Sequence, residues 1–314
     1  MSLGILIGTE RGLYGFFPGE RPHPLLPDLP VTSVDAHEGV AVIASAGNGV
    51  WLHDGGPPSD WRQVWEGDAR SARVTPEGDL LIGTAPPQLL RSSDGGETWE
   101  PSTTLESVVR YQRTRSTVTV SNAEWSLSAI AFPPDGILVG VLGAGVWLSM
   151  DEGRGWMPRS EGIDPAVTGL YEHPEHKDRV YATTRSGLFR SDDGGYTWLQ
   201  SLTGLDRSIA QSVSVMPESV DTLIMSASRG QSGQGAIFRS IDGGVRWMRI
   251  PVGDEDEWPA APIVTRLAGS LDTTFVLAGE RLWASHNRGI SWLPLTGDGD
   301  TASLPPASSL AVSL

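Results

Sequence analysis

One short pattern recurs along this chain and limits the folds that it can adopt. Ser, Asp or Asn, Gly and Trp occupy its first, third, fifth and eighth positions, as in Ser92-Ser-Asp94-Gly-Gly96-Glu-Thr98-Trp99. Four further copies begin at Ser149, Ser191, Ser240 and Ser285, and an eroded copy runs from His53-Asp54-Gly55-Gly56 to Trp61. The tryptophans of successive copies lie 38, 57, 42, 49 and 45 residues apart, which indicates a repeat architecture.

Each copy follows a short apolar stretch, so the pattern is expected in a hairpin turn between two strands. The stretches before the five intact copies are Leu89–Arg91, Val146–Leu148, Leu188–Arg190, Ile237–Arg239 and Leu282–Ala284. Asp or Asn accepts hydrogen bonds from backbone N–H groups inside a turn, and Gly adopts the positive φ that such turns need. The tryptophan then begins the next strand, where its ring covers the turn and its N–H seeks a local acceptor.

Further strand-like runs complete each repeat. Seven β-rich runs precede the turns: Ile5–Thr9, Val40–Ala46, Leu80–Thr84, Ile137–Leu142, Val180–Thr184, Leu223–Ala227 and Phe275–Ala278. Six of them follow another strand-like stretch, whereas Ile5–Thr9 does not, and Ser308–Leu314 is strand-like with no hairpin after it. We therefore predict an all-β fold, a seven-bladed β-propeller of four-stranded antiparallel blades, closed by the C-terminal strand completing the N-terminal blade.

The repeats extend over the whole chain and predict a single propeller domain over residues 1–314. The longest interval between tryptophans indicates an insertion near residues 103–123. Within it, Tyr111–Val120 mixes β-branched residues with arginine and is expected to form an extra hairpin arm.

Composition restricts the class of protein. The chain has no cysteine, which excludes disulfides and thiolate chemistry, and its net charge of −15 argues against a nucleic-acid partner. No run approaches the length of a membrane-spanning helix, and the N-terminus lacks the pattern of a leader peptide. We expect a cytoplasmic monomer, with secretion left open.

The repeated Ser-x-Asp-x-Gly-x-Thr-Trp pattern after an apolar strand resembles the Asp-box, or bacterial neuraminidase repeat. The chain is similar to the propeller family that includes sialidases, two-propeller xyloglucanases, sortilin-type receptors and a photosystem II stability and assembly factor. This resemblance implies that the box is structural and lies at the blade periphery. It does not imply one activity, since enzymes, receptors and assembly factors share the box.

The resemblance to sialidases allows one enzyme hypothesis to be examined. Sialidases use three arginines, a tyrosine nucleophile paired with a glutamate, and an aspartate acid/base. The Phe/Tyr-Arg-Ile-Pro motif of that family is absent, and Tyr171 with Glu172 is the one tempting pair, although neighbouring strand residues point to opposite faces. We predict no catalytic residue; an enzyme of this kind would be a glycoside hydrolase.

Three other motifs favour structural interpretations. Gly230–Gly235 is expected to be a flexible loop, and His173-Pro-Glu-His176 an exposed turn, since no helix aligns the two histidines for a metal. Asp254–Glu257 is expected to be a solvated acidic loop rather than a calcium site. We therefore predict no metal and no cofactor.

Arginines concentrate where a propeller exposes its loops. Of 23 basic residues 22 are arginine, and many fall in turns between second and third strands or in connections between blades. Such loops gather at one mouth of the channel in a propeller. The predicted ligand-binding residues are Arg11, Arg70, Arg110, Arg113, Arg115, Arg185, Arg207, Arg229, Arg281 and Trp125. Arg73 and Arg266 are candidates to reach the channel from first strands.

Two interpretations of these arginines stay open. They form an electropositive mouth that binds a carboxylate or phosphate, or they are solvated turn residues offset by Glu10, Asp68, Asp206 and Glu280. The predicted function is a non-enzymatic binding or scaffold propeller for a protein or a small anionic or carbohydrate ligand. The alternatives are a sialidase-type glycosidase and, third, an assembly factor.

Overall fold

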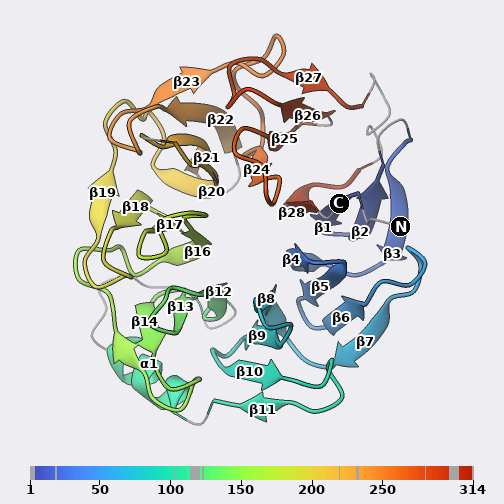
Figure 1. Ribbon diagram of the computed structural model, residues 1–314, viewed down its shortest axis with the longest axis vertical. Helices are drawn as coiled ribbons and strands as arrows, with labels where there is room; N and C mark the ends of the chain where they lie inside the picture. Colours follow the sequence, from blue (N-terminus) through green and yellow to red (C-terminus); the bar gives the residue numbers. More distant parts are fainter. Residues whose placement is uncertain are drawn as a thin grey trace. The chain divides into compact units, whose positions relative to one another are not determined.

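The computed structural model describes residues 4–17, 20–102, 104–113, 121, 124–218, 220–230, 233–279, 281–296 and 304–312. These residues form seven sheets of four antiparallel strands, and the fold is a seven-bladed β-propeller with one α-helix in the described part (Figure 1). Backbone contacts divide the chain into unit 1, Met1–Arg159 with Pro165–Val167 and Pro305–Leu314, and unit 2, Ser160–Asp164 with Thr168–Leu304. The predicted fold class is confirmed.

Unit 1 holds four blades, with strand orders β28-β1-β2-β3, β4-β5-β6-β7, β8-β9-β10-β11 and β12-β13-β14-β15. Their strands are β1 (Ile5–Thr9), β2 (Gly12–Phe16), β3 (His23–Pro27), β4 (Val31–His37), β5 (Val40–Ser45), β6 (Gly49–His53), β7 (Arg62–Trp65), β8 (Ala69–Val74), β9 (Leu80–Thr84), β10 (Leu89–Ser92), β11 (Glu100–Pro101), β12 (Leu127–Ala131), β13 (Ile137–Val141), β14 (Gly145–Ser149), β15 (Met157–Pro158) and β28 (Ala307–Val312).

Unit 2 holds three blades, with strand orders β16-β17-β18-β19, β20-β21-β22-β23 and β24-β25-β26-β27. Their strands are β16 (Val167–Glu172), β17 (Val180–Thr184), β18 (Gly187–Ser191), β19 (Leu199–Ser201), β20 (Ile209–Met216), β21 (Thr222–Gly230), β22 (Gly233–Ser240), β23 (Met248–Ile250), β24 (Ile263–Arg266), β25 (Thr274–Ala278), β26 (Arg281–Ser285) and β27 (Leu293–Pro294). The second strands are buried along their whole length or nearly so, as the apolar runs predicted.

The C-terminal strand completes the N-terminal blade, as predicted. Strand β28 lies beside β1 (Figure 1) and pairs with it antiparallel. Ile7 lies opposite Leu310 in this pairing. Ile7 is fully buried and Leu310 nearly so. The two ends of the chain therefore contribute to one hydrogen-bonded sheet.

Hydroxyl side chains on the first strands of unit 1 link neighbouring blades. Ser308 of β28 donates to the carbonyl of Val31 at 2.5 Å, and Thr32 of β4 donates to the carbonyl of Ala69 at 3.2 Å. Ser71 of β8 continues the series with a bond of 2.9 Å to the carbonyl of Leu127. Backbone carbonyls of the first strands thereby accept hydrogen bonds from the neighbouring blade.

The repeated pattern forms hairpin turns between third and fourth strands. In the first copy the Ser92 hydroxyl donates to Asp94 at 2.8 Å, and the N–H groups of Gly96 and Thr98 donate to Ser92 and Asp94. Gly96 has a φ of 88°, which explains the glycine at this position. The copies that begin at Ser149, Ser191, Ser240 and Ser285 repeat the serine bonds.

The tryptophans that end the turns connect blades as well as covering the turn. The Trp99 indole N–H donates to the carbonyl of Val64 in the preceding blade at 2.9 Å, and Trp247 donates to the Ser201 hydroxyl of its preceding blade at 2.8 Å. Trp156 donates both across the blades to Ser102 and locally to Gly153. The expected local acceptor is therefore found at Trp156, whereas Trp99 and Trp247 donate to the neighbouring blade.

The insertion contains a helix where a hairpin arm was expected. Helix α1 (Leu105–Arg113) includes the first residues of the predicted arm, so that prediction is wrong for residues 111–113, and residues 114–120 lie outside the described part. Leu105 and Val109 are fully buried, one helical turn apart, and pack with Trp125. The helical spacing of the apolar residues before Tyr111 therefore accounts for the helix, which the β-branched composition after Tyr111 did not indicate.

None of the helical residues that the structure describes forms a helix long and apolar enough to cross a membrane.

Candidate functional site

In unit 2, the structure brings two of the predicted arginines together at the turn between β21 and β22. Asp206 lies between them, 3.0 Å from the Arg229 guanidinium and 2.6 Å from that of Arg207. Burial of Asp206 opposes ionisation, but the hydrogen bonds from Arg207 and Arg229 outweigh it and lower the pKa of this carboxyl. Asp206 is therefore an anion shared by two cations.

The two arginines of this pair differ in access. The Arg207 side chain is fully buried, donates to the carbonyl of Gln234 at 2.7 Å and contacts Glu257 at 2.8 Å. The Arg229 side chain is half exposed. Arg207 thus holds the loops together, and Arg229 presents its guanidinium to solvent.

The acidic segment Asp254–Glu257 is exposed, as expected, but part of it forms ion pairs. Arg249 contacts Asp256 at 3.2 Å and Glu257 at 3.0 Å, and its hydrogen bond is the main cause that lowers the pKa of Glu257. Trp258, next to this segment, is buried in the unit 2 core and bridges to Gly235. The segment therefore packs against the β21–β22 hairpin.

Unit 2 carries an arginine in or beside the second-to-third-strand connection of each of its blades. Arg185 is half-buried in the β17–β18 turn, whose Thr184 hydroxyl donates to the carbonyl of Gly187, and Arg281 is exposed at the start of β26. Arg229 lies near the end of β21, and Gly230 pairs with Gly233 of β22, so the loop expected over Gly230–Gly235 is wrong for the residues that the structure describes there. Each of the three hairpins therefore carries an arginine in or beside its connection, although the exact position differs from blade to blade.

In unit 1 most of the described candidates have local partners. Arg70 makes two bonds to Asp68, at 2.7 and 2.8 Å. Arg110 pairs with Glu106 at 2.5 Å and lies 5.7 Å from the centre of the Trp125 ring. Arg11 is exposed and forms no ion pair with any residue that the structure describes.

Trp125 itself is a core residue. Its side chain is 6% exposed and packs with α1 residues, so it does not offer the open aromatic surface that its prediction as a ligand-binding residue assumed. The side chain of Arg113 and the whole of Arg115 lie outside the described residues.

The first-strand arginines also have structural partners. Arg73 donates to Asp35 at 3.2 Å and to the carbonyl of Ile130 at 2.8 Å, and stacks over Phe132. Arg266 donates to the carbonyls of Leu267 and Ser270, and burial lowers its pKa. These contacts lie within single units.

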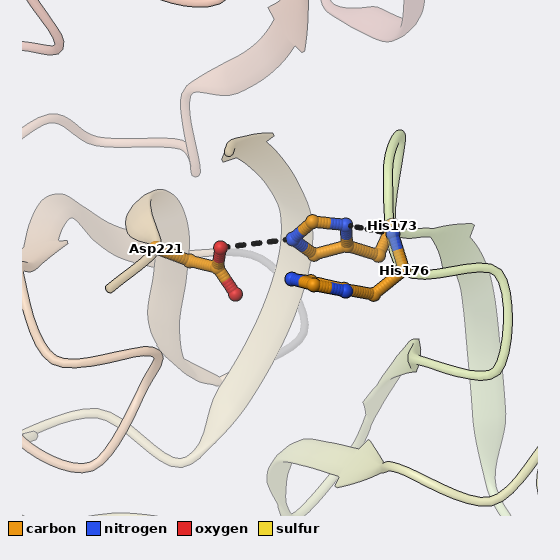
Figure 2. A group of neighbouring side chains, drawn as sticks. All are labelled: His173, His176 and Asp221. Carbon is orange, nitrogen blue, oxygen red and sulfur yellow. Dashed lines mark hydrogen bonds and ion pairs between the residues drawn. The ribbon is translucent and has the colours of Figure 1, made fainter. Parts of the chain in front are cut away.

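A buried charged cluster in unit 2 was not predicted. Figure 2 shows His173 pointing at Asp221, with 2.9 Å between His173 Nε2 and Asp221 Oδ1. Arg179 contacts the other oxygen of Asp221 at 2.5 Å, and the side chains of His173 and Asp221 are at most 1% exposed. The prediction of an exposed turn is therefore wrong for His173 and right for the exposed His176.

Hydrogen bonds define the protonation of this cluster. The backbone N–H groups of Glu175 and His176 donate to His173 Nδ1, which leaves the ring proton on Nε2, facing Asp221. Burial lowers the pKa of His173 despite the nearby carboxylate. Burial opposes ionisation of Asp221, but His173 and Arg179 outweigh it and lower the pKa of the carboxyl. The cluster is thus a neutral histidine with an ionised Asp–Arg pair.

The same geometry tests whether the cluster fits a metal ion. Ligand atoms of His173, His176 and Asp221 lie within 4.8 Å of one another (Figure 2). A metal on His173 Nε2 would displace the proton there while Nδ1 still accepts two amides, which requires an imidazolate or the loss of both amide bonds. The three side chains therefore fit a hydrogen-bonded core cluster better than a metal centre.

The tyrosines bear on the glycosidase hypothesis. The Tyr171 hydroxyl donates to the carbonyl of Gln211 at 3.3 Å, and Glu172 follows it on the strand. Tyr181 is fully buried, and burial is the main cause that raises its pKa. A nucleophilic tyrosine needs an accessible hydroxyl and an adjacent base. The fully buried Tyr181 does not offer an accessible hydroxyl.

Comparisons with known proteins agree on the fold. No protein-family model matches the chain. A glycoside hydrolase of family GH74 from Niastella koreensis superposes with a TM-score of 0.66 at 15% identity, over 92% of this chain and 46% of that one. YCF48 bound to a D1 peptide gives 0.57 at 15% identity, over 92% and 94%. A chain of the mitotic checkpoint complex gives 0.62 at 10% identity, over 90% and 81%.

A sequence relative covers a smaller part. The vacuolar protein sorting/targeting protein 10 of Schizosaccharomyces japonicus is 36% identical over 90 residues, which are 27% of this chain and 6% of that protein. The chain spans less than half of the GH74 protein as well. Together these similarities define the class of protein as a seven-bladed β-propeller, a fold shared by glycosidases and by propellers in protein complexes.

Proposed function

We propose that this chain is a non-enzymatic binding propeller that takes an anionic ligand or an acidic partner segment on the arginine-bearing turns of unit 2. The observation that carries this proposal is an arginine in or beside the connection between the second and third strands of three successive blades, Arg185, Arg229 and Arg281. Guanidinium groups bind carboxylate and phosphate with paired hydrogen bonds, and neighbouring turns allow one ligand to contact more than one of them.

The ion pair of Arg229 with Asp206 is compatible with this role. Asp206 stays bound to the buried Arg207 when Arg229 moves, so Arg229 can exchange one carboxylate for another without leaving an unpaired anion behind. An exposed ion pair of this kind contributes little to stability, and its exchange therefore costs little.

The similarity to propellers of comparable length supports a binding role. YCF48 is described in complex with a peptide, and this chain spans nearly all of that protein. An assembly factor would use the same kind of peptide recognition. A glycosidase is the competing function, and the hydroxyl bond of Tyr171 to a backbone carbonyl disfavours it.

The test compares ligand binding by two triple variants and measures glycoside turnover by the unmodified protein. The probe is polyglutamate, with inorganic phosphate in a second series. Arg185→Ala, Arg229→Ala and Arg281→Ala together are expected to weaken polyglutamate binding by about tenfold or more, with a reduced salt dependence. Arg110→Ala, Arg113→Ala and Arg115→Ala form the matched control in unit 1 and are expected to leave binding unchanged.

Two results would overturn the proposal. Loss of binding only in the unit 1 variant would move the site to the insertion. Turnover of a panel of sialosides and β-glucans by the unmodified protein would establish a glycosidase instead.

A further inference from the structure

Unit 2 exposes large apolar side chains along its outer rim. Six of them, which we call the apolar rim, are between 56% and 73% exposed. They are Leu199, Ile241, Val245, Met248, Ile290 and Leu293. All six lie in the repeated turns or in the fourth strands that follow them.

Arginines connect the strands and turns that carry the apolar rim from one blade to the next. Leu199 lies opposite Arg190 in the sheet, and Arg190 donates to the carbonyl of Gly243 at 2.9 Å, in the turn that carries Ile241 and Val245. An arginine of the third strand thus connects its own blade to the repeated turn of the next blade.

The next step along the rim repeats this arrangement. Met248 lies opposite Arg239, and Arg239 donates to the carbonyl of Arg288 at 2.8 Å, in the turn that carries Ile290. Leu293 follows in β27. The six side chains therefore follow one another over three blades.

The rim of unit 1 is different in chemistry. The residue directly after the turn tryptophan is Leu199, Met248 or Leu293 in unit 2, but Arg62 or Glu100 in two blades of unit 1. Met157 is the apolar exception in unit 1. The blades with Arg62 and Glu100 show that the turn does not need an apolar residue at this position. The hairpin itself therefore does not explain why exposed apolar residues recur there in unit 2.

Cations accompany the apolar rim. Arg239 and Arg246 form no ion pair with any described residue, although the chain as a whole carries a net charge of −15. The nearby carboxylates are already engaged: Asp242 accepts bonds inside its turn, and Asp192 and Glu218 pair with Arg190 and Arg288. The rim therefore combines apolar side chains with the guanidinium groups of Arg239 and Arg246, which interact with the charges of Glu218 and Asp242 only from beyond ion-pair distance.

We propose that the apolar rim of unit 2 docks an amphipathic segment of a partner protein that carries apolar side chains flanked by carboxylates. Apolar side chains on the partner would cover the row from Leu199 to Leu293, and its carboxylates would meet Arg239 and Arg246. A second copy of this chain fits less well, because a symmetric contact places the same arginines against each other. This surface is distinct from the proposed arginine turns.

The test uses two designed helical peptides of about 18 residues, five turns, which share one leucine face and differ only in carrying Glu or Lys on the other. Fluorescence anisotropy is expected to show about tenfold tighter binding of the Glu peptide. Leu199→Ser, Val245→Ser and Met248→Ser together should abolish binding, and Arg246→Glu should reduce the preference for Glu. Leu271→Ser, at an apolar residue outside the rim that is 52% exposed, is the matched control.

Equal binding of both peptides, or unchanged binding in the triple serine variant, would overturn the proposal. Concentration-dependent dimers that the triple variant loses, seen by sedimentation, would assign the rim to a second copy and overturn it as well. So would rim-dependent binding to phosphatidylserine vesicles in place of the Glu peptide. Polyglutamate has no apolar side chains, so its behaviour reports separately on the arginine turns.

Discussion

At the scale of single residues, Asp221 joins several parts of unit 2. Its side chain contacts His173 and forms an ion pair with Arg179, and its backbone carbonyl accepts from Gly243 in a repeated turn. The residues come from different hairpins, and Asp221 lies 48 residues after His173. Local sequence around His173-Pro-Glu-His176 contains no sign of this distant partner, which is why the histidine was expected at the surface.

Removal of the Asp221 carboxylate is expected to be costly. Asp221→Ala leaves Arg179 partly buried without one of its anions and His173 without an acceptor, so we expect a loss of about 3–5 kcal/mol of unfolding free energy. Asp192→Ala removes the half-exposed second partner of Arg179 and should cost less than about 1 kcal/mol. Urea unfolding monitored by tryptophan fluorescence measures both, and equal losses would contradict the proposed role of burial.

At the scale of elements, the repeated turns were predictable because their hydrogen bonds lie within eight consecutive residues. Ser, Asp and Gly each have a local reason to stand where they do. Helix α1 shows the opposite case. Leu105, Val108 and Val109 have helical spacing, which indicates the helix, whereas the β-branched residues that follow them favour a strand.

The turns should also make stability depend on pH in the acid range. Hydrogen bonds from Thr98 and Ser92 lower the pKa of Asp94 from 3.8 to about 2. Because the folded pKa lies below the unfolded one, the stabilisation is complete above about pH 4 and is lost as pH falls toward 2. Thermal melts between pH 2 and 6 should show this loss.

Asp94→Asn provides the comparison for this prediction. Asn287 already occupies the same position in the last turn and keeps the bonds to Ser285 and Ser291. The variant should therefore fold and show a shallower fall in melting temperature between pH 4 and 2. An identical fall in both proteins would show that Asp94 does not contribute to the acid transition.

At the scale of the whole molecule, the C-terminal strand β28 completes the N-terminal blade. Strand β28 covers β1 and places Ser308 against Val31 of the next blade. Without it, the buried residues Ile5 to Thr9 would present an unpaired, apolar edge. We therefore expect that removal of residues 305–314 yields an aggregation-prone protein.

A peptide of residues 304–314 added in trans should restore solubility and the thermal transition, whereas a scrambled peptide should not. In the full chain, Leu310→Ala should cost about 2–3 kcal/mol and Ser308→Ala about 1 kcal/mol in urea unfolding. A truncated chain as stable as the full one would contradict the closure.

The sequence by itself determined the fold of this protein, since its information is local and repeated: a turn that bonds to itself, an apolar strand before it, and an unpaired strand at each end of the chain. Tertiary structure alone decided which arginines are buried, as Arg207 is, and which are open, as Arg229 is. It also decided that Trp125 and His173 are core residues and that six apolar side chains remain on the rim. Burial depends on partners far away in the chain, and no local pattern reports them.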